Sequence, residues 1–195
     1  MTSTRKGERR RQALIEAAAE LMREGGLEAV RHRGVAQRAG LPLASTTYYF
    51  ASLDDLVVSA AEFEAADAMN RVDVLLAGVP RRARSIHTLT DLLVDVLVGR
   101  RVGADALASR YEQNLAIARH PELREIQVRM RAHTIAAISE VLARSGRPVS
   151  EARARALEAM VAGAVLGAVL DEPPDLAGTV RSLLFDVIDQ LAPPG

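Results

Sequence analysis

Apolar residues recur along most of the chain at the spacing of an α-helix, so the pattern predicts an all-α fold. In the first segment, the apolar positions that share one helix face are Leu14, Ala17, Ala18, Leu21 and Met22. Gly25-Gly26 ends this segment, because glycine tolerates the left-handed conformation that follows a helix. Similar segments continue to the end of the chain, and we predict about nine helices in all.

Glycine, proline and capping residues mark the ends of these segments. Ser52, with Asp55 three positions later, resembles a capping box at the start of the fourth helix. The predicted helices cover residues 6–24, 32–39, 44–50, 52–77, 82–98, 104–119, 121–145, 150–170 and 175–191. The short helices end near Phe50, so the pattern predicts two domains, residues 1–51 and 52–195.

The second and third segments are short and are joined by the turn Gly40-Leu41-Pro42-Leu43. Two helices joined by a short turn near a glycine are typical of a helix-turn-helix. In that motif the second helix enters the DNA major groove, and its first residues meet base edges. The small and hydroxylated side chains that open this helix are therefore predicted to contact DNA: Ala44, Ser45, Thr46 and Thr47.

The chain has three tyrosines and three phenylalanines, and three of these aromatic residues are consecutive, Tyr48-Tyr49-Phe50. A tyrosine hydroxyl can bind a phosphate while its ring packs on the protein. Plain core packing is the alternative for each ring. We expect some of the rings to anchor the third helix and at least one to face DNA, so Tyr48 and Tyr49 join the predicted contacts.

Charge is concentrated near the start of a chain whose formal net charge is zero. Residues 1–12 contain five basic residues and one glutamate, a local net charge of +4. Arg31, Arg33 and Arg38 flank the second predicted helix. Basic residues beside a helix-turn-helix indicate a surface for phosphates, whereas the alternative is an ordinary solvated face.

Several other kinds of protein have no signature in the sequence. Cysteine is absent, which excludes disulfides, thiolate metal sites and a cysteine nucleophile. The most apolar run, residues 159–170, is shorter than the ~20 residues that span a bilayer. None of the four histidines has a glutamate three positions before it, and no HExxH, G-x-S-x-G or P-loop motif occurs. We expect a cytoplasmic protein that is not an enzyme and needs no metal or cofactor.

Residues 10–58 resemble the DNA-binding domain of the TetR family of transcriptional regulators. The residues that carry the resemblance are Gly25-Gly26, Val35-Ala36-x-x-Ala39-Gly40, Tyr49-Phe50, Ser52 and Leu56. The nine-helix layout extends the likeness to the rest of the chain as architecture alone. The resemblance implies a homodimer that binds a palindromic operator and represses transcription until a small-molecule effector releases it.

The resemblance also implies roles for single residues. Arg31 stands where the second helix of the family usually opens near a Ser or Thr that meets phosphate, so positive charge replaces the cap. Arg33 matches a position that is often basic and faces DNA. Leu53 stands where the family often has a lysine that binds phosphate, which puts that contact in doubt.

For the larger domain, the resemblance implies an effector cavity among helices four to seven and a four-helix bundle formed by the last two helices of each subunit. The candidates to line the cavity are Phe63, His87, Arg110, Tyr111, Asn114 and His133, and residues 109–114 rank first because they are polar within an apolar helix. Gly163 and Gly167 would allow close approach in the bundle, although a helix buried in one subunit would show the same pattern. A helical dimeric adaptor or ligand-binding protein that has lost DNA binding is the alternative function.

Overall fold

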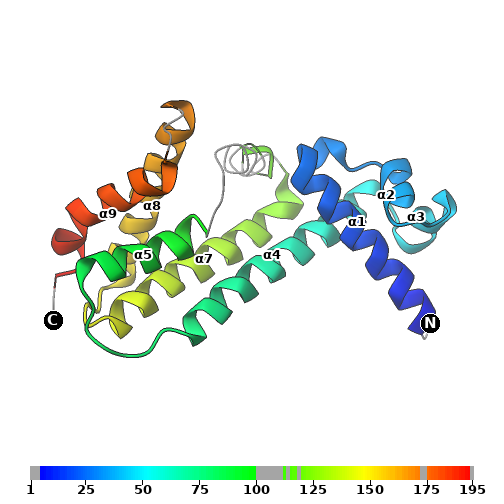
Figure 1. Ribbon diagram of the computed structural model, residues 1–195. Helices are drawn as coiled ribbons and strands as arrows, with labels where there is room; N and C mark the ends of the chain where they lie inside the picture. The colour runs from blue at the N-terminus through cyan, green and yellow to red at the C-terminus, as the bar shows by residue number, and fades with distance from the viewer. Residues whose placement is uncertain (1–4, 100–111, 113–114, 118–119, 172–174, 194–195) are drawn as a thin grey trace. The chain divides into compact units, whose positions relative to one another are not determined.

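The computed structural model describes residues 5–99, 112, 115–117, 120–171 and 175–193, and all regular structure in these ranges is helical (Figure 1). The all-α prediction is confirmed. The described helices are α1 (Arg5–Ala29), α2 (His32–Arg38), α3 (Leu43–Tyr49), α4 (Leu53–Ala77), α5 (Ile86–Leu97), α7 (Pro121–Arg144), α8 (Glu151–Asp171) and α9 (Leu176–Leu191). Most of the helix predicted over residues 104–119 lies outside the described residues, although residues 115–117 are helical.

The chain forms two compact units. The first consists of Met1–Asp67 and Glu112–Gln127, and the second of Ala68–Tyr111 and Val128–Gly195. The long helices α4 and α7 each contribute to both units. A functional boundary between residues 51 and 52 therefore remains a prediction about roles, because it follows the end of the short helices and not the division into compact units.

The first unit is built from α1, α2, α3 and the beginnings of α4 and α7. Its core contains Leu14, Val35, Phe50 and Leu56, each no more than 2% exposed. The predicted break at Gly25-Gly26 is confirmed, because Gly26 has φ +69 and the helical rise resumes only after it. The predicted cap of α4 by Ser52 is also confirmed, because the Asp55 amide donates to Ser52 Oγ at 3.0 Å. The Asp55 carboxylate accepts at 3.1 Å from the Ala51 amide, one residue before the Ser52 amide that a capping box uses.

The second unit has its core between α5, α7, α8 and α9. The largest fully buried side chains of this core are Leu89, Leu93, Ile138, Leu142, Leu157, Leu184 and Ile188. α5 begins at Ile86 and not at residue 82 as predicted, because Ser85 caps it by accepting a hydrogen bond from the Thr88 amide. Among the described residues, no helix combines the length and apolar character needed to cross a membrane.

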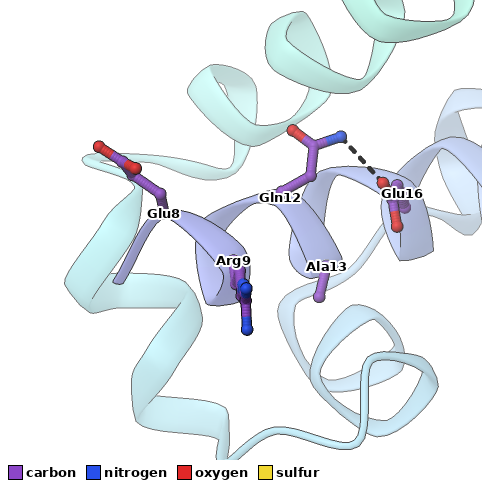
Figure 2. Close-up of a pocket in the computed structure, with 5 residues that line it drawn as sticks. All are labelled: Glu8, Arg9, Gln12, Ala13 and Glu16. Atoms are coloured by element: carbon purple, nitrogen blue, oxygen red, sulfur yellow. Dashed lines mark hydrogen bonds between the residues drawn. The ribbon is translucent and has the colours of Figure 1, made fainter. Parts of the chain in front are cut away.

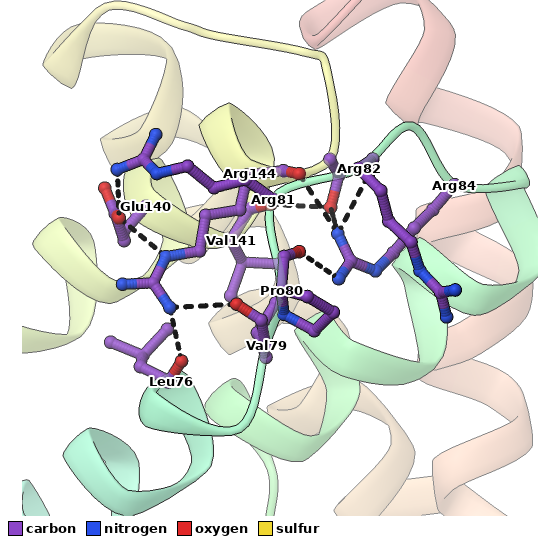
Figure 3. A network of polar contacts seen from close by, with 10 residues as sticks. Leu76, Val79, Pro80, Arg81, Arg82, Arg84, Glu140, Val141 and Arg144 are labelled. Atoms are coloured by element: carbon purple, nitrogen blue, oxygen red, sulfur yellow. Dashed lines mark hydrogen bonds and ion pairs between the residues drawn. The ribbon is translucent and has the colours of Figure 1, made fainter.

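Two arginines join the ends of α4 and α7 in the second unit (Figure 3). The Arg144 guanidinium, from the last residue of α7, donates to the carbonyl oxygens of Leu76 and Val79 at the end of α4. Its Nε also donates to Glu140 at 2.7 Å, which lowers the pKa of that carboxyl. The last carbonyl groups of a helix have no partner within the helix, so Arg144 supplies donors that α4 itself lacks.

Arg84 makes the reciprocal connection from the segment between α4 and α5 (Figure 3). It donates to the Arg144 carbonyl and to Ser145 Oγ, both at 3.1 Å, at the end of α7. It also donates to the Pro80 carbonyl, so the segment between α4 and α5 is held together by a side chain of its own. Burial and the neighbouring Arg82 and Arg144 lower the pKa of Arg84. Each helix end is thus capped by an arginine from another segment.

Replacing Arg144 by methionine tests this capping. The side chain is only 24% exposed, so the Val79 carbonyl loses its side-chain donor and the Leu76 carbonyl keeps only the Val79 amide, without full access to water. We expect the free energy of unfolding to fall by about 1–3 kcal/mol, measured by urea denaturation with circular dichroism.

The control is Arg155→Met, which removes an exposed pair between Arg155 and Glu151 within α8. This change should alter stability by no more than about 0.5 kcal/mol. Equal effects of the two substitutions on the free energy of unfolding would show that the partly buried contacts of Arg144 do not stabilise the fold.

Candidate nucleic-acid interface

The turn between α2 and α3 has a defined geometry. Gly40 has φ +64, and two hydrogen bonds close the end of α2: Leu41 N–H to the Ala36 carbonyl at 2.9 Å and Gly40 N–H to the Gln37 carbonyl at 3.2 Å. This pair of bonds is the Schellman motif, which requires a residue in the left-handed region. The prediction that Gly40 stops the second helix is confirmed. Pro42 follows, and it holds the extended conformation from which α3 starts.

The seven residues of α3 differ sharply in exposure. Leu43, Ala44, Thr47 and Tyr48 are exposed, and Ser45 and Tyr49 are half-buried. Thr46 is 0% exposed, and its hydroxyl donates to the Leu43 carbonyl at 2.8 Å. The prediction that Thr46 contacts DNA is therefore wrong: it lies on the inward face of α3, one turn before the buried Phe50, and its hydroxyl is satisfied within the helix.

The three consecutive rings have different environments. Phe50 is 2% exposed and lies under the Arg11 guanidinium, 5.1 Å from the ring centroid. Tyr49 is half-buried and meets Tyr48 edge to face, with centroids 4.9 Å apart. Tyr48 is 74% exposed. Phe50 therefore anchors α3, as expected for some of the rings, and Tyr48 is the ring that an external partner can reach.

The arginines near α2 fall into two groups. Arg31 occupies the N-cap of α2 without a side-chain cap, and its guanidinium donates to Glu28 at 2.7 Å. Arg33 is exposed, and no ion pair involves it within the described part of the chain. Arg33 therefore keeps its whole charge for an outside anion, whereas Arg31 shares its charge with a glutamate.

Arg38 has a different role from the one its position in the sequence indicates. Its guanidinium binds Glu24 at 2.7 Å and Glu20 at 3.1 Å, which ties α2 to α1. The hydrogen bond from Arg38 lowers the pKa of Glu24. Two carboxylates compensate its charge, so Arg38 does not belong to the phosphate-binding surface predicted from the sequence.

The first turns of α1 carry further exposed cations. Arg5, Lys6, Arg9 and Arg10 are exposed, and in the described ranges none of them forms an ion pair. Arg9 also borders an open surface depression of about 460 Å³ along α1 (Figure 2). The other residues that line it are Glu8, Gln12, Ala13 and Glu16, and Gln12 donates to Glu16 at 3.0 Å. None of the residues predicted to bind an effector lines this depression.

The residues predicted to bind an effector have separate surroundings where they are described. Phe63 is half-buried in the first unit. In the second unit, His133 Nε2 lies 2.9 Å from Asp73 Oδ1, and the ring centroids of His87 and Phe185 are 4.8 Å apart. Arg110, Tyr111 and Asn114 lie outside the described residues. No group of three or more potential metal-binding side chains occurs in the described part of the chain.

Leu43 was missed by the prediction from the sequence. The sequence pattern places it in the turn, but it is the first residue of α3 and is 53% exposed. The proline before it was the available signal, because proline is favoured just before or at the start of a helix. The exposed surface of α3 thus begins one residue earlier than predicted.

Two family models match the chain. Residues 14–60 match the model described as bacterial regulatory proteins, tetR family. Residues 84–190, more than half of the chain, match the model described as tetracyclin repressor-like, C-terminal domain. No curated protein sequence matches the chain.

Solved structures of similar fold cover nearly the whole chain. The multidrug binding protein EbrR complexed with proflavin is 32% identical, with 92% of this chain and 99% of that chain covered and a TM-score of 0.66. EbrR has also been solved in complexes with imidazole and ethidium. A member of the TetR family from Streptomyces coelicolor A3 is 32% identical over 94% of this chain and 98% of that chain, with a TM-score of 0.62. A transcriptional regulator from Rhodococcus sp. Rha1, 23% identical over 95% of this chain and 98% of that chain with a TM-score of 0.69, shows the fold alone.

Substitutions of Tyr48 and Phe50 distinguish an exposed ring that contacts DNA from a buried ring that stabilises the core. Tyr48→Ala should weaken DNA binding by about 5- to 30-fold, the effect of one lost hydrogen bond with its ring contact, and leave thermal stability unchanged. Phe50→Ala should instead destabilise the protein by about 3–5 kcal/mol. Fluorescence anisotropy on a DNA duplex and thermal denaturation measure the two effects. Loss of helical signal in Tyr48→Ala would mean that this ring belongs to the core.

Proposed function

The chain belongs to the TetR family of bacterial regulatory proteins, and from this membership we propose that it is a homodimeric repressor that leaves a palindromic operator when a small-molecule effector binds. DNA-binding transcriptional regulation, with a ligand-binding C-terminal domain, is what the family match establishes. The repressor role, the operator and the release are our proposal. The observation that carries it is the exposed face of α3, held rigidly by the closed end of α2. We further propose that the chain has no enzymatic activity.

In this proposal DNA is bound by two kinds of side chain. Arg33 and the exposed cations of α1 neutralise phosphates, and Arg31 adds to them once DNA competes with Glu28. Ala44, Ser45, Thr47, Tyr48 and Tyr49 lie on or beside the face of α3 that meets the groove. Leu53 is half-buried at the start of α4, so it does not replace the phosphate-binding lysine.

The last two helices support a dimer. α8 and α9 pack against each other through a buried core, yet both also keep large apolar side chains at the surface. Met160, Leu166 and Phe185 are 37%, 45% and 39% exposed, and Gly163 on the same side of α8 has open space around it. An apolar surface of this kind is typical of a helix pair that completes a bundle with a second subunit.

A two-fold dimer dictates the form of the operator. Two recognition helices related by such an axis meet half-sites about 34–36 Å apart, one helical turn of DNA. Each half-site is then read by an identical surface, so the sequence must be a palindrome. The proposed palindrome therefore depends on the proposed two-fold dimer, and evidence against either one counts against the other.

The effector is proposed from the relatives. EbrR is described as a multidrug binding protein and has been solved with proflavin and ethidium, which are planar aromatic cations. We propose the same chemical class here. The residues to substitute first are Arg110, Tyr111 and Asn114, which the sequence ranks first, and Phe63, His87 and His133 follow. Effector binding can weaken DNA binding only by its differential affinity for the two states, typically about 1–3 kcal/mol.

Selection of operators from a random duplex library tests the proposed function. We expect enrichment of a palindrome, and a dissociation constant that rises steeply with salt because the exposed cations displace counterions. Deleting residues 1–8, which removes Arg5 and Lys6, should reduce the salt slope by about 2 per subunit without changing the selected sequence. A folded dimer that enriches no sequence would favour the adaptor function, once mass spectrometry of the denatured protein had ruled out a copurified effector.

The dimer interface is tested by Phe185→Arg. A buried charge at an apolar interface should raise the dimer dissociation constant by about 30-fold or more, measured by analytical ultracentrifugation. Val128→Arg is the matched control, because Val128 is 63% exposed but lies on α7. A dimer that tolerates Phe185→Arg as well as Val128→Arg would place the interface elsewhere.

A further inference from the structure

The amino-acid composition of α3 is unusual for a helix that recognises a DNA sequence. Its seven residues, LASTTYY, include no Arg, Lys, Asn, Gln, Asp or Glu. The side chains that read guanine or adenine by paired hydrogen bonds are Arg, Lys, Asn and Gln, and those that read cytosine are Glu and Asp. The hydrogen bonds that most often discriminate bases in the major groove are therefore not available from the side chains of α3.

Both threonine hydroxyl groups of α3 are bonded within the helix, and the remaining small hydroxylated residue, Ser45, is half-buried. Thr46 is buried and bonded to the Leu43 carbonyl. Thr47 is exposed, but its hydroxyl donates to the Ala44 carbonyl at 3.3 Å. With the hydroxyl turned back to the backbone, the methyl group is the part of Thr47 that remains for an outside partner.

The exposed groups at the start of α3 are consequently apolar. Leu43 offers an isobutyl side chain that is 53% exposed, Ala44 a methyl group, and Thr47 a second methyl group one turn after Leu43. Leu43 and Thr47 are four residues apart, so they are neighbours on one helix face. We call Leu43, Ala44 and Thr47 the apolar strip. Tyr48 lies beside it with a hydroxyl that suits a phosphate.

We propose that the apolar strip reads thymine, by packing against the C5 methyl groups that this base presents in the major groove. Thymine is the only one of the four bases with a methyl group there, so an apolar surface can select it without a hydrogen bond. Leu43 is the main specificity-determining residue, because it has the largest exposed apolar side chain of the strip. The inference rests on the proposed function, in which α3 meets the major groove.

The test uses the full-length protein and the operator obtained by selection. Each thymine is replaced in turn by uracil, which keeps the base pair and removes only the methyl group. At the thymines that meet the strip, we expect about a fourfold loss of affinity for each methyl removed, and about 16-fold when both half-sites are changed. Thymines outside the contacted positions serve as internal controls and should give no loss.

Protein variants connect the effect to Leu43. Leu43→Ala should bind thymine and uracil operators with nearly equal affinity, whereas Leu43→Met, which keeps an apolar side chain, should retain the preference. A double-mutant cycle between Leu43→Ala and the uracil operator gives the coupling directly. Because Leu43 is exposed, both variants should keep the helical signal and melting temperature of the unmodified protein.

A methylated cytosine supplies the converse experiment. Replacing the contacted thymine by cytosine should weaken binding, and 5-methylcytosine at the same position should recover about fourfold, because the methyl group returns while the hydrogen-bonding pattern stays that of cytosine.

The outcomes separate the inference from the function on which it rests. A selected operator that binds equally well with uracil at every position overturns thymine reading and leaves the regulator intact. A uracil effect that Leu43→Ala does not reduce overturns the assignment to Leu43. If the selection enriches no operator sequence, the proposed function is contradicted, and the inference that rests on it is contradicted as well.

Discussion

The arrangement of the helices depends on one constraint: the last carbonyl groups of each helix need donors that the helix cannot supply. At the end of α2, Gly40 meets this need by turning into the left-handed region, and the two amide bonds that result set the direction in which α3 leaves. At the end of α7, Gly146 makes the same turn with φ +80, and Arg84 adds side-chain donors. The position of the recognition helix is thus a consequence of how the helix before it ends.

Arginine has three distinct functions in this chain. Arg84 and Arg144 are half-buried and bind the carbonyl groups at helix ends, while Arg38 joins two helices through two carboxylates. Arg33 and the exposed cations of α1 keep their charge for a polyanion. A balanced net charge is therefore compatible with DNA binding, because glutamates neutralise Arg38 and Arg144, whereas Arg33 and the exposed cations of α1 form no ion pair in the part of the chain that the structure describes.

Local features were predictable from the sequence, and tertiary ones were not. Helix periods, the helix end at Gly40 and the cap of α4 by Ser52 follow from residues within a few positions of one another, and all agree with the structure. Arg38 was misjudged because its carboxylate partners lie 14 and 18 residues away in the sequence. Thr46 was misjudged because a hydroxyl that bonds to its own helix can be buried at little cost. Phe63 and His133 fall in different compact units, and periodicity alone carried no information on that division.

The exposure of Leu43 has a consequence for how this protein can evolve. Core residues of a helix-turn-helix change slowly, because each replacement must preserve packing and so lowers stability. Leu43 stands outside the core, and substitutions at such surface positions shift stability by no more than about 0.5 kcal/mol. Under the proposed role of Leu43, a single codon change at this position in a duplicated gene alters operator preference without requiring compensating mutations for stability.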